Sequence, residues 1–407
     1  MMGNLAENRT IVKQESEIVL TAEQKDLVTK INLAKTKARD FVCSCITEEA
    51  LCRLTPKSET SPYALCFTIF LLNFLGDKEI ITGQRELWDR KIRQTLKELK
   101  DSREQAGVPL KSDKVFLQLL TFSLSSLHLL GTLKQDPLAE IIEPLLPQNV
   151  SAELKEKGCL EGKAQSGNQA MFMAILLLHA KEHLGLQTDA KIQEWVSCHL
   201  DAMNEFGFWG KQKALTHLQF QNGYHQYEIF NYLNVDVPRL SKMSSNLIAL
   251  ADSYGHFAPY PGGGGCYDFD AIFLLTYPRL KQEDVSEQLL QKIAKQILLE
   301  QKENGGFAEN VHLNALSPYF YLKVIRQLAS SNSILLLEER LKRTLSVLRP
   351  KNRRVHTHWT QYSRQWGEAD LWDTWFRLQA IALIQKRLWP ELKMQWGFIE
   401  YPGIGFH

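Results

Sequence analysis

Seven mostly apolar segments recur along this chain at intervals of about fifty residues. They begin near residues 61, 112, 168, 222, 267, 316 and 370. Each is apolar on nearly all sides, which is typical of buried helices. Charged, amphipathic segments separate them, for example TGQRELWDRKIRQTLKELK and VSEQLLQKIAKQILLEQ. The chain therefore alternates fully buried helices with helices that show one face to water.

A closed ring of helical hairpins satisfies this alternation, because its inner helices are covered on both sides and its outer helices on one. We therefore predict an all-α fold, an α/α toroid of six or seven hairpins over residues 56–407. Residues 1–55 are predicted to form a helical segment that packs on the barrel. The alternative is a helical protein of two domains, although no long linker rich in Pro, Gly or Ser divides the sequence.

Short motifs mark where these helices begin and end. Ser61 and Ser317 each precede a proline, the order expected of a helix N-cap and first helical position. Glycines in FGFWG, YGHFAP, NGGFAE and WGFIEYP are expected to end outer helices with positive φ, namely Gly207, Gly255, Gly305 and Gly397. These turns should lie at one end of the barrel, together with the N-termini of the inner helices and their converging dipoles.

Four successive glycines precede two aspartates in PGGGGCYDFDAIFLL, which begins at Pro261. Four glycines cost conformational entropy on folding, so a geometric reason for them is expected. Two close carboxyl groups in an apolar setting raise one pKa, and a protonated Asp can act as a general acid. Asp268 and Asp270 are therefore candidate catalytic residues. The alternative interpretation is helix capping, which needs no chemistry.

Two other predicted inner helices open with polar residues of interest. In QNGYHQYE, His225 and Glu228 share a helix face and Tyr227 lies between them in sequence. These side chains could act as acid and base or bind a substrate, or they could form a buried hydrogen-bond network. Asn168 opens the third predicted inner helix, where it could bind a substrate oxygen or cap the helix.

The last predicted inner helix opens with DLWDTWFR. Asp370 and Asp373 share a face, and Asp373 can pair with Arg377 at i+4. Trp372 and Trp375 would supply flat apolar walls, which stabilise carbocations, stack on sugars or simply fill the core.

The segment QKENGGF, from Gln301 to Phe307, resembles the repeat of the prenyltransferase and squalene-cyclase superfamily. The segment DFDA followed by IFLL resembles the Asp-x-Asp-Asp acid motif of class II terpene cyclases, with Ala271 in place of the last Asp. This resemblance implies that Asp270 is the proton donor, that Asp268 supports it, and that aromatic residues such as Tyr267 line the pocket.

The predicted function is thus a terpene cyclase-like enzyme that starts the cyclisation of an isoprenoid by protonation. No cofactor or metal is predicted, and Mg²⁺ would enter only with a diphosphate substrate. The zinc set of the protein prenyltransferases is missing, since Cys266 and Asp268 have only His312 and His358 as weak partners.

Two alternatives stay open. A carbohydrate-active enzyme would use Asp270, Asp373 or Glu228 as acid and base, or Asn168, His225 and Tyr227 as a lyase set. A non-catalytic scaffold would bind a peptide or a lipid.

Composition and charge limit the partners. The net charge of +2 gives no reason to expect nucleic acid. The most hydrophobic segment, residues 63–75, is shorter than the roughly 20 residues that a membrane span needs. The first residues do not have the pattern of a signal peptide. The seven cysteines are expected to be reduced thiols of a cytoplasmic protein. The expected partner is a small hydrophobic molecule, while peripheral membrane contact and the oligomeric state stay open.

Overall fold

The structure, a computed structural model, describes residues 21–211, 213–313, 318–392 and 395–407. Over these residues the chain is mostly helical, which confirms the all-α prediction. In the described ranges the strands form two short antiparallel pairs, β1 (Phe307–Ala308) with β4 (Ala369–Asp370) and β2 (Arg354–Val355) with β3 (Arg364–Gln365). The predicted cap Ser317 and the first part of the predicted segment 1–55 lie outside the described residues.

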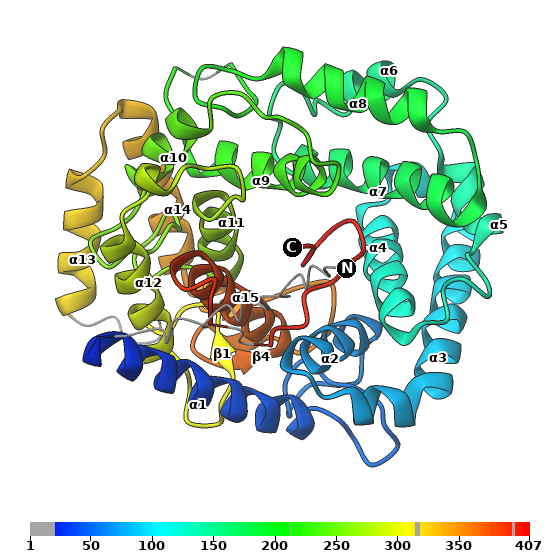
Figure 1. Cartoon of the computed structure of the whole chain (residues 1–407), viewed down its shortest axis with the longest axis horizontal. Coiled ribbons are helices and arrows are strands. Elements are labelled where there is room, and N and C mark those ends of the chain that lie inside the picture. The colour runs from blue at the N-terminus through cyan, green and yellow to red at the C-terminus, as the bar shows by residue number, and fades with distance from the viewer. Residues whose placement is uncertain (1–20, 212, 314–317, 393–394) are drawn as a thin grey trace, which may run out of the picture.

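Six of the seven predicted buried helices begin within five residues of the expected position. They are α2 (Pro62–Leu75), α4 (Lys114–Leu130), α7 (Ser166–Leu184), α9 (His217–Tyr232), α11 (Gly265–Leu275) and α15 (Leu371–Leu388). Each packs on the next, α2 on α4, α4 on α7, α7 on α9, α9 on α11 and α11 on α15, and α15 packs back on α2 (Figure 1).

The amphipathic helices lie outside these six. They are α1 (Ala22–Ser44), α3 (Lys78–Gln105), α5 (Ala139–Ile142), α6 (Val150–Glu156), α8 (Asp189–Ala202), α10 (Leu240–Ile248), α12 (Glu287–Leu299) and α14 (Ile334–Leu348). Helix α3 packs on α2 and α4, α8 on α7, α10 on α11, and α12 on α15. Helix α1 packs on α2, α12 and α15 (Figure 1). Short 3-10 turns cover Leu110–Ser112, Glu143–Leu145, Gln282–Asp284 and Pro350–Asn352.

Among these six helices, called the inner helices below, the N-terminal ends of neighbours lie close together. A Cβ added at Gly167 in α7 would lie 2.0 Å from the carbonyl oxygen of Asn222 in α9, and one at Gly265 would lie 2.4 Å from Asp373 Oδ1. Several helix starts have the expected cap; the Ser61 side chain, for instance, accepts a hydrogen bond from the backbone N–H of Ala64. The candidate residues at these helix starts are therefore gathered at one end.

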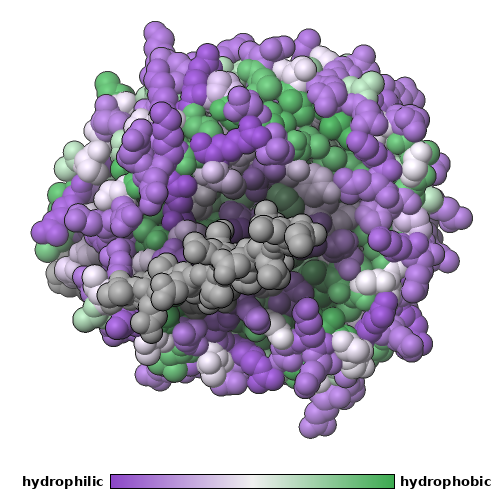
Figure 2. Space-filling view, viewed as in Figure 1, coloured by the Kyte–Doolittle hydropathy of each residue, from purple (hydrophilic) through white to green (hydrophobic). Residues whose placement is uncertain are grey.

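The C-terminal segment, residues 395–407, covers the opposite ends of these helices. Tyr401 and His179 share a hydrogen bond of 2.8 Å near the end of α7. The His407 ring contacts Phe273 near the end of α11, with the ring centres 6.1 Å apart. The space-filling view in Figure 2 shows a mostly hydrophilic surface with separate hydrophobic patches and a hollow near its centre.

Three of the four predicted glycine turns have the expected positive φ, but these glycines do not end the helices, because α8, α10 and α12 end at Ala202, Ile248 and Leu299, five to seven residues earlier. Gly207, Gly255 and Gly305 have φ of 83°, 94° and 88°. The prediction is wrong for Gly397, whose φ is not positive and which lies against the end of α2. There its N–H donates to the carbonyl oxygen of Phe74, at 3.0 Å. Gly397 is needed for close packing rather than for a left-handed turn.

Replacement of Gly397 by Ala is expected to lower the free energy of unfolding by about 1–3 kcal/mol, as overpacking does. The new Cβ would lie 2.1 Å from the carbonyl oxygen of Asn73. The matched control is Gly83→Ala in α3, where nothing lies within 4 Å of the new Cβ. That variant should be more stable than the wild type by about 0.5–1 kcal/mol. Urea unfolding of both variants checks the pair, and equal effects would contradict the packing role of Gly397.

The prediction is also wrong for the seventh helix, which was expected to be buried on all sides. Helix α13 (Pro318–Ala329) packs on α14 and on the loop before the four glycines, where Gln327 donates to the carbonyl oxygen of Ala258 at 2.9 Å. Its other side is uncovered, and Ile325 is 62% exposed. The apolar sequence of α13 therefore reflects an exposed face and not burial on all sides.

Candidate functional site

The candidate residues lie where the N-terminal ends of α9, α11 and α15 come together. Helix α11 places Asp268 in its first turn, and Asp370 is the N-cap of α15. Asp268, Asp270, Asp370 and Asp373 are all buried. Four buried carboxyl groups must be paired or protonated, because an isolated buried charge is very costly.

The four glycines border these charged groups. A Cβ added at Gly263 would lie 2.3 Å from Asp268 Oδ2 and 2.6 Å from His256 Nδ1. At Gly262 it would lie 2.5 Å from the His312 ring, and at Gly264 it would lie 3.0 Å from Glu309 Oε1. Gly262 and Gly263 also have positive φ. The expected geometric reason is therefore the close approach of backbone to charged side chains.

Asp268 is fully engaged by groups from three parts of the chain. Its Oδ2 lies 2.5 Å from Arg377 Nη1 and 3.1 Å from His256 Nδ1. Its Oδ1 accepts a hydrogen bond of 2.7 Å from the N–H of Phe257. Burial alone would raise the pKa of Asp268, but the Arg377 and His256 charges and these hydrogen bonds lower it. Asp268 is thus held ionised.

The ion pair that the sequence suggested between Asp373 and Arg377 is not formed, because each of the two side chains has another partner. Arg377 reaches Asp268, while Asp373 Oδ2 accepts a hydrogen bond of 2.8 Å from Arg364 Nη2. Arg364 Nε also lies 2.7 Å from Asp370 Oδ2. Asp370 in turn accepts from the N–H of Asp373 as the helix cap. Both carboxyl groups of the DLWD segment are therefore bound to one buried arginine.

Two imidazole nitrogens converge on one carboxylate oxygen beside Asp268. Glu300 Oε1 lies 2.9 Å from His256 Nε2 and 3.5 Å from His312 Nε2. This set has the ligand types that hold Zn²⁺. However, the Arg377 guanidinium lies 3.8 Å from the other oxygen of Glu300. Arg377 and a protonated His256 balance the charges of Asp268 and Glu300, so we interpret the cluster as a buried ion-pair network.

This network predicts that the free energy of unfolding falls as the pH rises above about 6.5, the ordinary pKa of His. Burial would lower the pKa of His256, but the charges of Glu300 and Asp268 raise it to about 10. A group whose pKa is raised by folding stabilises fully below its unfolded pKa and loses that effect as the pH rises through its folded value. The expected loss is on the order of a few kcal/mol, measured by urea unfolding from neutral pH to about pH 10.

The control for this prediction is His256→Phe. Phe208 occupies the equivalent position after Gly207, so a phenylalanine ring is compatible with this turn. In the variant the loss of stability above neutral pH should be much weaker. An unchanged slope would show that His256 is not the titrating group.

Asp270 has no such partners. It is 3% exposed, and within the described part of the chain no hydrogen bond or ion pair engages its carboxyl group. Burial first, and then the charges of Glu228 and Asp268, raise its pKa well above the ordinary value. Burial and these neighbouring charges therefore favour the neutral form of Asp270, whereas the partners of Asp268 favour its ionised form.

Glu228 lies on α9 close to Asp270. The hydroxyl of Tyr224, which lies one turn before Glu228 in the helix, donates a hydrogen bond to Glu228 Oε1. The second oxygen of Glu228 lies 3.7 Å from His225 Nδ1, a distance too long for a hydrogen bond. His225 and Glu228 thus share a face as expected, and the nearest hydroxyl to the glutamate comes from Tyr224, which the sequence interpretation did not select.

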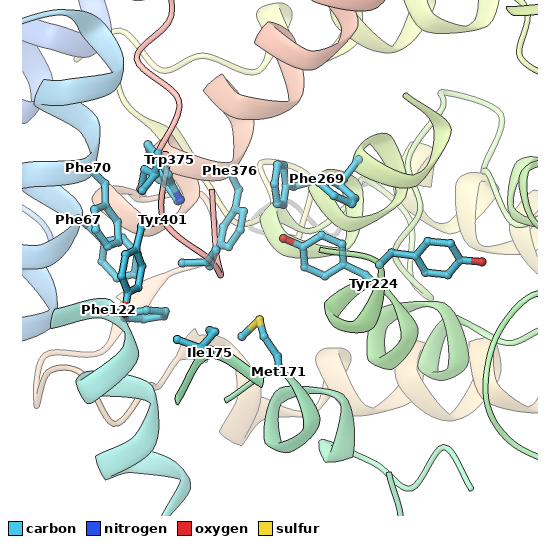
Figure 3. Packing of buried hydrophobic residues seen from close by; sticks show 14 of the residues in the cluster. Phe67, Phe70, Phe122, Met171, Ile175, Tyr224, Phe269, Trp375, Phe376 and Tyr401 are labelled. Carbon is cyan, nitrogen blue, oxygen red and sulfur yellow. The ribbon is translucent and has the colours of Figure 1, made fainter. Parts of the chain in front are cut away.

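Aromatic rings from α9, α11 and α15 pack against one another and against Tyr224. Phe269 of α11 lies 4.9 Å from Phe376 of α15, between ring centres. The Tyr224 ring lies 5.6 Å from Phe269 and 5.2 Å from Phe273. Figure 3 shows Phe376, Phe269 and Tyr224 side by side across the middle of the core, above Met171 of α7.

The other predicted binding residues are placed differently. The Tyr227 hydroxyl donates to the carbonyl oxygen of Gly207, so it secures a turn. Trp375 is fully buried between α15 and α2 and contacts Phe70 (Figure 3). Trp372 contacts Trp359, with ring centres 4.2 Å apart and the ring planes tilted by 54°. These three side chains belong to the packing of the protein.

Tyr267 and Asn168 are half-buried. The Tyr267 ring lies 6.4 Å from that of Tyr260, beside the four glycines. Helix α7 begins at Ser166, so Asn168 lies in its first turn and is not the cap.

The sequence interpretation missed three buried partners, His256, Glu300 and Arg364, and the half-buried Glu309. Of these residues, only His256 could have been selected from the sequence. It follows the glycine of a left-handed turn, and the residues at the same position of the other two turns are Phe208 and Gly306. A histidine that replaces an apolar or small residue in a repeated buried turn indicates a special environment.

Comparison of the chain with protein-family models, with curated proteins and with solved structures gave no match.

Proposed function

We propose that this protein is an isoprenoid cyclase of the class II type, in which Asp270 protonates a carbon–carbon double bond. The observation that carries the proposal is the contrast between Asp270, which is buried and has no partner among the described residues, and Asp268, which Arg377 and His256 hold. We further infer that the six mutually packed inner helices form an α/α toroid around the reaction site.

The proton transfer can be followed atom by atom. The O–H bond of Asp270 breaks, its proton joins one alkene carbon, and the alkene electron pair forms the new C–H bond. A carbocation remains on the substrate, and rings such as Phe269, Phe376 and Tyr224 would stabilise it by cation–π interaction. The cyclised cation then loses a proton from a carbon next to the charge, and the electron pair of that C–H bond forms the double bond of a product with the mass of the substrate. The Asp270 carboxylate left behind lies near Glu228 and Asp268, so repulsion favours its reprotonation.

The carbohydrate-active alternative would need a second carboxyl group in addition to Asp270, and its other two candidates already have partners. A sugar-cleaving enzyme needs two carboxyl groups that reach the same glycosidic bond. Asp373 is bound to Arg364, and Glu228 accepts from Tyr224. The same pairing leaves Asp370 and Asp373 poorly available for Mg²⁺, so the proposal uses neither a metal nor a diphosphate.

The test is incubation of the purified full chain with acyclic polyprenes and prenyl diphosphates, followed by extraction and mass spectrometry. We expect a cyclised product of unchanged mass from a polyprene that keeps no diphosphate. Absence of any isomerised product across the panel would overturn the proposal. Conversion of diphosphates alone, with release of inorganic diphosphate, would replace protonation by ionisation as the first step.

A further inference from the structure

Exposed apolar side chains are concentrated on one hairpin, α13–α14. Of the twelve large apolar residues that are exposed in the described part of the chain, nine lie on these two helices. They are Tyr319, Tyr321, Leu322, Ile325, Ile334, Leu335, Leu337, Leu341 and Leu345. Apolar residues scattered singly need no explanation, whereas a contiguous exposed group marks an interaction surface.

The spacing of these residues gives each helix an apolar outer face. On α14, Ile334, Leu337, Leu341 and Leu345 recur at three- and four-residue intervals, so they form one stripe. The buried face of α14 carries Leu336, Arg340 and Thr344 instead. On α13, Tyr321, Leu322 and Ile325 lie away from the buried residues Lys323 and Gln327.

Buried polar contacts attach the inner side of the hairpin to the rest of the protein. Arg340 is fully buried and donates hydrogen bonds of 2.8 Å to the carbonyl oxygens of Gln327 and Leu250. The ammonium group of Lys323 lies 4.0 Å from the ring centre of Tyr254. The hairpin is therefore docked in a defined orientation, and its apolar side chains are exposed. Helix α13 lies at the edge of the molecule (Figure 1).

Charge indicates what covers this face. Residues 318–354 contain nine Lys or Arg and two Glu, although the whole chain carries only +2. Lys342, Arg343, Arg349, Lys351 and Arg353 are exposed. Of the two acids, Glu339 accepts from the backbone N–H groups of His217 and Leu218. A second copy of the chain would bring like charges together, whereas an anionic lipid surface would attract them.

We propose that the α13–α14 hairpin docks the protein on an anionic lipid membrane. The apolar stripes would enter the boundary between headgroups and acyl chains, and the basic side chains would face the lipid phosphates. No helix in the described ranges combines the length and the apolar character needed to cross a bilayer, so docking is peripheral. The proposal is independent of the chemistry at Asp270.

Vesicle sedimentation tests the proposal with the full chain. We expect binding to phosphatidylcholine vesicles that contain about one third phosphatidylglycerol, weaker binding to phosphatidylcholine alone, and release by salt. Ile325→Ser with Leu341→Ser should reduce partitioning about tenfold or more, because each exposed apolar side chain would be buried on docking. Lys342→Glu with Arg349→Glu should reduce it by at least about fivefold for each basic residue lost.

Matched controls lie elsewhere on the surface. Leu299→Ser removes an apolar residue that is 80% exposed on α12, and Lys91→Glu with Lys97→Glu reverses two exposed charges on α3. Both controls should bind like the wild type. Binding equally reduced by the controls, or no binding to either vesicle, would overturn the proposal. A dimer in sedimentation that Ile325→Ser with Leu341→Ser dissociates, without vesicle binding, would assign the face to a second copy.

Discussion

Asp270→Asn is expected to lower turnover of an isoprenoid substrate by about 10²–10⁴-fold, the usual contribution of a general acid. The amide keeps the size of the carboxyl group but has no acidic proton to give to an alkene. Folding should be little affected, because no hydrogen bond or ion pair engages the Asp270 carboxyl group within the described residues. The measurement is product formation by mass spectrometry beside thermal unfolding of the same preparation.

Asp268→Asn is the matched control for this prediction. It makes the same chemical change two residues earlier, but it removes the charge that pairs with Arg377 at 2.5 Å. This variant should unfold at a lower urea concentration than Asp270→Asn does. Wild-type turnover in Asp270→Asn would exclude Asp270 as the proton donor. Equal instability of both variants would show that Asp270 serves the fold.

The helices could be predicted from the sequence because each start depends on local chemistry. Ser61 with Pro62 is a cap in the structure as expected, and the glycines at 207, 255 and 305 form left-handed turns. The prediction for Gly397 was wrong because a glycine can be required either by positive φ or by close packing, and here it is required by close packing against Asn73. An isolated sequence motif does not distinguish these two reasons.

Helix α13 shows a different limit. Its apolar residues were expected to be buried on all sides, but Tyr321 and Ile325 lie on an uncovered face. Hydrophobic periodicity shows that a face avoids water, but it does not show whether the protein itself covers that face. The basic residues that follow in α14 are the additional signal.

The pairing of the buried charges could not be predicted, since the partners are far apart in sequence. Asp373 has Arg377 at the favourable i+4 spacing, yet it pairs with Arg364 from the β3 strand. Arg377 is then available to Asp268, 109 residues away. In the buried interior the tertiary arrangement decides such pairs, because the local i+4 preference is worth only about 0.2–0.5 kcal/mol.

Arg377→Met is expected to lower the free energy of unfolding by about 3–5 kcal/mol, the cost of breaking a buried ion pair from one side. Arg377 is 1% exposed and lies 2.5 Å from Asp268 and 3.8 Å from Glu300. Methionine fills much of the space but removes the guanidinium from two buried carboxylates, Asp268 and Glu300, which His256 bridges. Urea unfolding followed by circular dichroism measures the loss, with Arg377→Lys as the variant that keeps the charge.

The pH dependence of this loss separates charge from packing. The Arg377 charge helps to lower the pKa of Asp268 and of Glu300, and removing it should raise both. Carboxyl groups whose pKa is lowered by folding stabilise above their unfolded pKa, and that effect disappears as the pH falls through the folded value. The difference between wild type and Arg377→Met should therefore shrink in acid, and Asp268→Asn added to Arg377→Met should recover part of the loss. A difference that stays constant with pH would mean that Arg377 contributes through its packing, and then the ionised state of Asp268 beside the neutral acid Asp270 would need another source.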